Sequence, residues 1–331
     1  MRIATVIADA RYRLMLTEGA DARLDVLGHV DRATGDTREV TVQAPDLLRS
    51  ADVILTGWGS PSLQEAWLDS APNLRLICHC AGSVCGIIPT SIYARGITLC
   101  HAAPIIADSV AEFCISLELL WLRRPHIMDR QLKAGVPWRE VGQFTGSLLA
   151  ARRVGLVGSG YVAQRHIRLL LAFGATVRVT DPYLSAERAA ELGVERASLE
   201  EVFGESDIIA IHAPKTTETH HLITADLLVR IKPDAILIQN ARSWVVDQEA
   251  LLRELQTGRF VAAIDVFDQE PQPPDSPFFA LDNVIVTPHA AGHSRDSHER
   301  QGLAMVEEIE RFSRSEPLRY AIAAERYELL A

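Results

Sequence analysis

Short apolar runs rich in β-branched residues recur along the first hundred residues. Three of them span Ile3–Ala8, Asp52–Thr56 and Leu74–Cys80, and amphipathic segments such as Ser62–Leu68 lie between them. Strand patterns that alternate with helical patterns predict a parallel sheet with crossover helices. We therefore expect an α/β domain at the start of the chain.

A long helix is predicted after this region. Ser109 and Glu112 have the spacing of a capping box, and apolar residues then follow at intervals of three and four up to about Arg123. The apolar face of this helix is broader than a monomer normally exposes. It therefore favours a homodimer.

A second and more regular series begins at Arg153. Its candidate strands are Val154–Val157, Thr176–Asp181, Asp207–His212, Ala235–Asn240, Val261–Val266 and Asn283–Thr287. Its candidate helices include Val162–Phe173, Ala225–Ile231, Gln248–Leu255 and Arg295–Arg314. Six strands with this rhythm fit one doubly wound sheet.

Composition narrows the class of protein. A chain of 331 residues is long enough for about two domains, and a content of 48% hydrophobic and 23% charged residues disfavours a disordered or fibrous chain. The net charge of −10 disfavours a nucleic-acid partner. The longest uncharged run, Leu76–Ala94, contains glycines and Pro89, so it predicts no membrane span. Asp9 interrupts the first apolar run too early for a signal peptide, and we expect a cytoplasmic protein.

The cysteines predict neither a disulfide framework nor a metal site. They are five in number and all lie between positions 78 and 114, which favours a reducing compartment. One residue separates Cys78 from Cys80, whereas zinc ligands are usually two to four residues apart, so buried structural thiols are the simpler interpretation. His293 and His298 lie five positions apart, and we expect both to be solvated.

A glycine-rich turn joins the first strand of the second series to its helix. The turn reads Gly158-Ser159-Gly160-Tyr161-Val162-Ala163 and matches G-x-G-x-x-G/A. The first glycine permits a tight turn, and the second lets the backbone approach a pyrophosphate at the helix N-terminus. Asp181 ends the next strand, where a carboxylate binds the adenosine ribose hydroxyls and repels a 2′-phosphate, although it could instead cap a helix before Pro182. We predict a dinucleotide site that prefers NAD to NADP.

Three further segments carry groups suited to chemistry on a carbonyl. Arg242 and His289 each closely follow a predicted strand, and Glu270 lies in the loop after another. Ligands of open parallel sheets bind at the carboxyl ends of the strands, so these groups can converge. An arginine binds a carboxylate in a bidentate manner, and a histidine beside a carboxylate can exchange the proton of a hydroxyl.

With these motifs the sequence resembles the D-isomer-specific 2-hydroxyacid dehydrogenases. The matching segments cover about residues 100 to 295 in the family order. They are the glycine turn, His212-Ala213-Pro214 with Thr216 and Thr219, Asn240-Ala241-Arg242, Asp265-Val266-Phe267 with Glu270-Pro271, and Thr287-Pro288-His289.

The resemblance implies both the architecture and the roles of individual residues. A Rossmann nucleotide-binding domain (101–295) would be inserted into a flavodoxin-like substrate domain (1–100 and 296–331), and both would be doubly wound parallel sheets. Arg242 would bind the substrate carboxylate, and His289, paired with Glu270, would be the general acid and base. The groups expected around NAD, besides the glycine turn and Asp181, are Ala213, Pro214, Thr219, Ala241 and Asp265. The family dimerises through the helix predicted at 109–123.

Departures from the family pattern fall near the expected substrate. The substrate loop usually contains Gly-x-Asp, whereas Ser83-Val84-Cys85 stands here, so backbone groups of Gly82, Ser83 and Val84 are the expected carboxylate ligands. Ser243 and Trp244 follow the arginine where the family has glycine. Reduction of a 2-keto acid is the favoured function. An NAD(H)-sensing corepressor-like scaffold and a phosphite dehydrogenase-type enzyme remain the alternatives.

Overall fold

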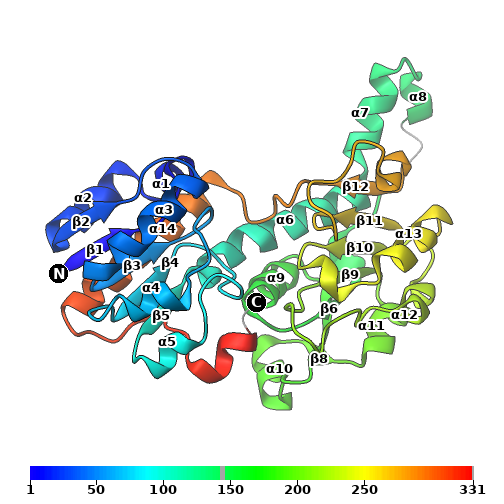
Figure 1. Ribbon diagram of the computed structural model, residues 1–331. Helices are drawn as coiled ribbons and strands as arrows, with labels where there is room; N and C mark the ends of the chain where they lie inside the picture. The colour runs from blue at the N-terminus through cyan, green and yellow to red at the C-terminus, as the bar shows by residue number, and fades with distance from the viewer. Residues whose placement is uncertain (142–145, 330–331) are drawn as a thin grey trace. The chain divides into compact units, whose positions relative to one another are not determined.

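The computed structural model describes residues 1–141 and 146–329, and these form two compact units. Unit 1 consists of Met1–Ala107 with His293–Ala331, and unit 2 of Asp108–Gly292. The chain passes from unit 1 to unit 2 within one helix, α6 (Ala103–Arg123), and returns between Gly292 and His293 (Figure 1).

The sheet of unit 1 has five parallel strands in the order β2-β1-β3-β4-β5. They are β1 (Arg2–Thr5), β2 (His29–Arg32), β3 (Val53–Thr56), β4 (Leu76–His79) and β5 (Thr98–His101). This is the flavodoxin-like strand order. The register pairs Thr56 with His79 and His79 with His101, so the carboxyl ends of three strands lie side by side.

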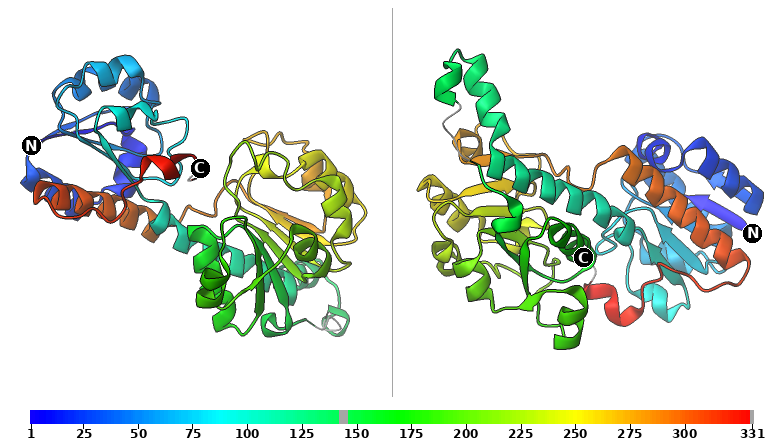
Figure 2. Two further views of the ribbon diagram at one scale, coloured as in Figure 1. Left: turned by 90° about the horizontal axis from the view of Figure 1, so that it is seen from below. Right: turned by 180° about the vertical axis from the view of Figure 1, so that it is seen from behind.

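Helices cover both faces of this sheet because its strands are apolar on both sides (Figure 2). Val53 and Leu55 point to one face, where they pack with Met305 and Ile309, and Ile54 points to the other, where it packs with Leu48. The helices of unit 1 outside α6 are α1 (Asp9–Met15), α2 (Glu18–Leu27), α3 (Thr37–Ser50), α4 (Glu65–Asp69), α5 (Ser91–Ala94), α14 (Arg295–Ser313) and the 3-10 helix η4 (Ala324–Leu329).

The sheet of unit 2 has seven parallel strands in the order β12-β11-β10-β9-β6-β7-β8. They are β6 (Arg153–Val157), β7 (Thr176–Thr180), β8 (Glu195–Arg196), β9 (Ile208–Ile211), β10 (Ile236–Gln239), β11 (Val261–Ile264) and β12 (Val284–Val286). The chain runs outward from β6 in both directions, which is the Rossmann order with its switch point between β6 and β9. Both parts of the predicted fold class are therefore confirmed.

Helices pack on this second sheet through apolar residues such as Val202, Leu228 and Leu251. The helices and 3-10 turns of unit 2 after α6 are α7 (Pro125–Lys133), α8 (Trp138–Val141), η1 (Leu149–Ala151), α9 (Tyr161–Ala172), α10 (Ala186–Leu192), α11 (Leu199–Glu205), α12 (Ala225–Arg230), η2 (Ser243–Val245), α13 (Gln248–Gln256) and η3 (Pro277–Ala280). α7 has no buried residue and projects with α8 from the body of the unit (Figure 1).

The predicted start of the long helix is wrong. α6 begins at Ala103, six positions before Ser109, because Pro104 suits the first turn of a helix, where no amide donor is needed. Ser109 therefore lies inside the helix, and its hydroxyl donates to the carbonyl of Ala291 instead of capping. The apolar face is also covered within the chain: Val110, Cys114 and Trp121 are buried. This face is not the exposed surface from which a homodimer was predicted.

Several short elements carry no strong sequence pattern. The strands β2 and β8 lie at sheet edges and have exposed or half-buried polar residues. An edge strand needs no continuous apolar run, since it packs on fewer neighbours. Among the described residues no helix is both long enough and apolar enough to cross a membrane.

Candidate active site

The glycine turn leaves open space at the N-terminus of α9. Gly158 has a φ of +101°, and a Cβ there would lie 3.0 Å from the backbone of His212, so only glycine fits between the two strand ends. A Cβ on Gly160, the N-cap of α9, would meet nothing within 4 Å. The free amides of the first helical turn, which include Tyr161 and Val162, therefore face a space that fits a pyrophosphate.

Asp181 is held against this turn. One carboxylate oxygen accepts hydrogen bonds from the amide and the hydroxyl of Ser159, both at 2.7 Å, and the other accepts from the amide of Tyr183 at 2.8 Å. The next helix, α10, is capped by Ser185, so Asp181 is not a helix cap. The acid is fixed beside the phosphate turn, and each of its oxygens keeps a lone pair for a ribose hydroxyl.

A loop after β9 forms the adjoining wall and is organised by threonines. The Thr219 hydroxyl donates to the carbonyl of Pro214 at 2.7 Å and accepts from the amide of Thr216 at 2.9 Å. Trp244 anchors the same loop: its indole N–H donates to the carbonyl of Thr216 at 2.8 Å, and its ring lies 4.0 Å from that of His220. The bulky residue that departs from the family pattern thus supports the predicted cofactor wall. Ala213, in the same wall, is buried.

His289 and Glu270 are in direct contact. The Nδ1 atom of His289 lies 2.8 Å from one Glu270 carboxylate oxygen, and the other oxygen accepts from the amide of Phe267 at 2.9 Å. The side chains are 46% and 37% exposed, so solvent reaches the pair. With Nδ1 directed at the carboxylate, Nε2 is the ring atom left to face a ligand.

Asp265 is a fully buried carboxylate that holds the loop carrying His289. It accepts hydrogen bonds from the Thr287 hydroxyl at 2.5 Å and from the amides of Ala290 and Ala291 at 2.7 and 2.9 Å. The amide of His289 donates to the Asp265 carbonyl, and His289 has a φ of +52°, a conformation that side chains rarely adopt. This anchoring role was missed, because the partners are more than twenty residues apart.

Arg242 follows β10, the strand between β9 and β11. Its guanidinium donates to the carbonyl of Ala241 at 2.7 Å, and its own carbonyl accepts from Gln239 at 2.9 Å. Since β10, β11 and β12 are neighbours, the three predicted catalytic residues all arise at the carboxyl edge of adjacent strands. Only the His289–Glu270 pair is in direct hydrogen-bond contact.

The predicted substrate loop, Gly82 to Val84, lies in unit 1 after β4. The Val84 side chain is buried in the core, so only its backbone can face a ligand. His101 holds the loop from below, with Nδ1 3.3 Å from the Gly82 carbonyl, and His79 lies beside it with Nδ1 2.8 Å from the Thr56 hydroxyl. Burial lowers the pKa of His79 to about 3 and that of His101 to about 4, so both are neutral near pH 7.

A buried polar chain in unit 2 was also missed. Nε2 of His166 lies 3.0 Å from a carboxylate oxygen of Glu118, and its Nδ1 lies 3.0 Å from Nε2 of His212. Cys114 approaches the same pair of histidines and accepts from the Asn240 amide at 3.4 Å. Burial, followed by the charge of His166, lowers the pKa of His212 well below its usual range. The sequence gave no signal, because these residues come from four separate segments.

Comparisons with known proteins agree with this geometry. Residues 115–291 match the family described as D-isomer specific 2-hydroxyacid dehydrogenase, NAD binding domain. A glyoxylate reductase of Korarchaeum cryptofilum is 34% identical over 252 residues, which are 75% of this chain and 76% of that protein. A D-3-phosphoglycerate dehydrogenase of Mycobacterium leprae is 33% identical over 285 residues, or 84% of this chain, and the chain spans about half (53%) of that relative.

A solved structure extends the similarity to the whole chain. D-lactate dehydrogenase from Aquifex aeolicus, complexed with NAD and lactic acid, superposes with a TM-score of 0.74 at 26% identity. The match covers 96% of each chain, and so includes both sheets.

Proposed function

The chain belongs to the D-isomer-specific 2-hydroxyacid dehydrogenases and its cofactor is NAD, and from this premise we propose that it interconverts a D-2-hydroxy acid and its 2-keto acid. The observation that carries the proposal is the 2.8 Å contact between His289 and Glu270. It supplies what reduction of a carbonyl requires, a proton donor whose ring is oriented and whose positive charge is balanced.

In the proposed reduction, NADH when bound supplies a hydride to the carbonyl carbon, and His289 supplies the proton. The proton passes from Nε2 to the carbonyl oxygen, which becomes the hydroxyl of the product. Glu270 accepts the hydrogen bond from Nδ1 and stabilises the imidazolium before transfer. Oxidation of the hydroxy acid reverses each step, with neutral His289 taking the hydroxyl proton.

Binding of the substrate carboxylate is assigned to Arg242 and to the backbone of the Gly82–Val84 loop. A guanidinium matches the two oxygens of a carboxylate and also draws electron density from the adjacent carbonyl. In this proposal residues 1–100 and 296–331 form the substrate domain and residues 101–295 the NAD-binding domain. The contacts of Asp181 and Thr219 support their roles in the cofactor wall.

We also propose a homodimer in a reducing compartment. Trp138 is 78% exposed on α8, and Leu148 and Phe279 are also exposed in unit 2, which provides apolar surface that a second copy could cover. All five cysteines are free thiols, which is consistent with a cytosolic enzyme. Trp138→Ser should yield a monomer in sedimentation velocity runs at micromolar concentration. A wild-type protein that already sediments as a monomer would contradict the dimer.

The decisive test of the function is an NADH oxidation assay with a panel of 2-keto acids, read at 340 nm. The proposal expects turnover that Arg242→Gln lowers mainly through KM, while NADH binding by fluorescence titration is retained. The alternative of an NAD(H)-sensing scaffold predicts NADH binding without turnover. Turnover of phosphite but of no keto acid would identify the phosphite dehydrogenase-type reaction instead.

A further inference from the structure

Unit 1 contains an aromatic and basic cluster that the proposed mechanism does not use. Trp58 follows β3, and its ring centroid lies 4.3 Å from that of His293 and 4.8 Å from that of His298. The two imidazoles lie 5.3 Å apart at right angles. Arg11, on α1, runs across Gly59: a Cβ on this glycine would be 3.2 Å from the Arg11 Cγ. We name these four residues, Arg11, Trp58, His293 and His298, the Trp58 cluster.

The histidines differ from the sequence expectation. His293 is exposed as predicted, but His298 is only 6% exposed, because the first turns of α14 pack against the end of β3 and α1. Its Nε2 atom has no hydrogen-bond partner among the described residues. A buried imidazole nitrogen without a partner is costly, which indicates that a ligand group completes this site.

The cluster is also positive without a compensating acid. The exposed guanidinium of Arg11 forms no ion pair within residues 1–141 and 146–329, in a protein with a net charge of −10. Burial lowers the pKa of His298, and the positive charges of His293 and Arg11 lower it further. Since the N-terminus of α14 adds the positive end of its dipole, an anion would relieve the mutual repulsion of these groups.

The cluster lies at the edge of the sheet that carries the proposed substrate loop. β3 and β4 are neighbours, with Thr56 beside His79, so Trp58 and the Gly82–Val84 loop leave adjacent strand ends. That loop and Arg242 are assigned to the substrate carboxylate. The Trp58 cluster is therefore available for whatever lies beyond the keto group.

We propose that the Trp58 cluster binds a second anionic group, so that the substrates of this enzyme are 2-keto acids with a carboxylate or a phosphate at their far end. Arg11 and the two histidines supply charge and N–H donors, and the face of Trp58 packs on the carbon chain between the two anionic ends. The inference rests on the proposed function and narrows its substrate class.

Isosteric substrates test the charge directly. Oxaloacetate carries a carboxylate where 4-methyl-2-oxopentanoate carries two methyl groups, and 3-phosphohydroxypyruvate carries a phosphate. The wild-type enzyme should reduce one or both anionic acids with a kcat/KM at least about tenfold above that of the neutral acid, as expected for a hydrogen bond to a charged group. The ratio between oxaloacetate and 3-phosphohydroxypyruvate then identifies the anion.

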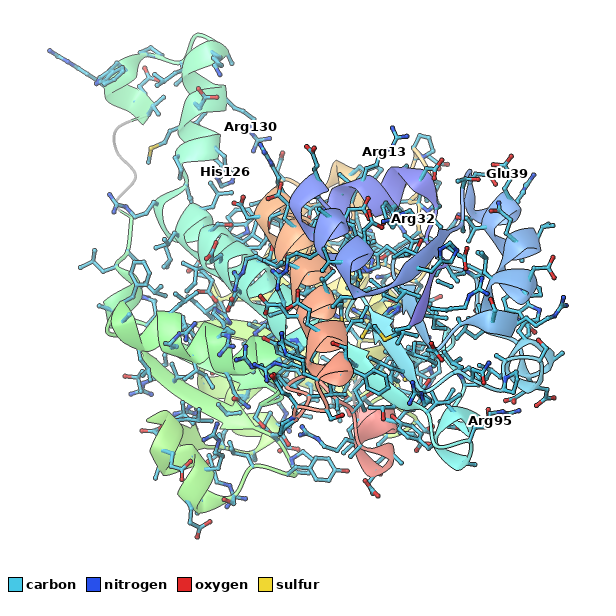
Figure 3. All side chains as sticks on the ribbon, turned by 90° about the vertical axis from the view of Figure 1, so that its left-hand side faces the viewer. Arg13, Arg32, Glu39, Arg95, His126 and Arg130 are labelled. Atoms are coloured by element: carbon cyan, nitrogen blue, oxygen red, sulfur yellow. The ribbon has the colours of Figure 1, made fainter. Side chains whose placement is uncertain are left out.

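Arg11→Gln tests the assignment of the site. The variant should lose about tenfold in kcat/KM for the preferred anionic acid, mainly through KM, and stay within about twofold for 4-methyl-2-oxopentanoate. Because Arg11 is exposed, the variant should fold normally. Arg13→Gln is the matched control, since Arg13 is another exposed arginine of the same short helix (Figure 3), and it should change neither value.

The outcomes separate this inference from the function beneath it. Preference of the wild type for the neutral acid, or an equal loss with both acids in Arg11→Gln, would overturn the anionic subsite while leaving keto-acid reduction intact. No turnover with any keto acid would overturn the proposed function, and the subsite with it.

Discussion

The carboxyl edges of the two sheets place histidines in opposite environments. In unit 2, His289 is half exposed and touches the Glu270 carboxylate at 2.8 Å. In unit 1, His79 and His101 are buried beneath a loop and contact a hydroxyl and a carbonyl. A carboxylate can balance an imidazolium, whereas a neutral partner in a dry site stabilises only the uncharged ring.

This difference separates proton transfer from positioning. The unit 2 histidine has a partner suited to each step of a proton cycle, and solvent can replace the proton. The unit 1 histidines stay neutral over the range in which an enzyme works, and they serve as fixed hydrogen-bonding groups below the Gly82–Val84 loop. The same residue type therefore has two roles, which its surroundings assign.

Replacing His289 should break the comparison most strongly. His289→Asn keeps a residue that tolerates the positive φ but removes the acid, so kcat should fall by roughly 10²–10⁴-fold. NADH affinity should stay within a few-fold of wild type. The matched variant in unit 1, His101→Asn, should retain kcat within a few-fold, since that side chain transfers no proton. Steady-state kinetics with NADH measure both, and residual activity above a tenth in His289→Asn would contradict the role.

Acid should destabilise unit 1 through its buried histidines. Their folded pKa values, about 3 and about 4, lie below the unfolded value of about 6.5. The stability that depends on their neutral forms is complete above pH 6.5 and is lost as pH falls towards 4 and then 3. The slope is at most on the order of 1.4 kcal/mol per pH unit for each histidine.

Thermal unfolding between pH 7 and pH 4 measures this effect. Tm should fall steeply in wild type and less steeply in a His79→Asn, His101→Asn double variant, whose side chains do not titrate. Fluorescence can separate the units, because Trp58 and Trp67 lie in unit 1, whereas Trp121, Trp138 and Trp244 lie in unit 2. Identical slopes in the two proteins would assign the acid sensitivity to other groups, such as the buried His212.

Neutralising Glu270 should make the unit 2 pair resemble the unit 1 pairs. Glu270→Gln keeps an acceptor for the amide of Phe267 but removes the charge beside His289. The alkaline limb of kcat/KM for reduction should move to lower pH by about one unit. Asp268→Asn, which removes an exposed carboxylate from the same loop, is the control and should leave the profile in place. An unshifted profile in Glu270→Gln with full activity would refute the pair.

The smallest expected effect concerns the cofactor. Asp181→Ala should weaken NADH binding by about tenfold and reduce the preference of the wild type for NADH over NADPH, because a carboxylate acceptor near the ribose is lost. Ser159→Ala removes only one of the hydrogen bonds to Asp181 and should weaken binding by less. Isothermal titration with both dinucleotides measures these changes. Equal wild-type affinities for NADH and NADPH would remove Asp181 from its proposed role.

The sequence by itself determined the order of the main elements and the local motifs. β6, the glycine turn and α9 follow one another within twenty residues, so apolar periodicity and the glycine spacing suffice to predict them. The same holds for Asp181 at the end of β7, and for Arg242, Glu270 and His289 near strand ends. Each of these features depends on residues that are close together in the chain.

Tertiary structure decided what depends on contacts between distant segments. Asp265 holds the His289 loop, Trp244 supports the cofactor wall, and Glu118 pairs with His166 across two helices. The Trp58 cluster joins α1, the end of β3 and the start of α14, and the same packing buried His298, which the sequence suggested would be solvated. No local pattern encodes such pairs, because burial and neighbouring charge arise only when separate segments pack together.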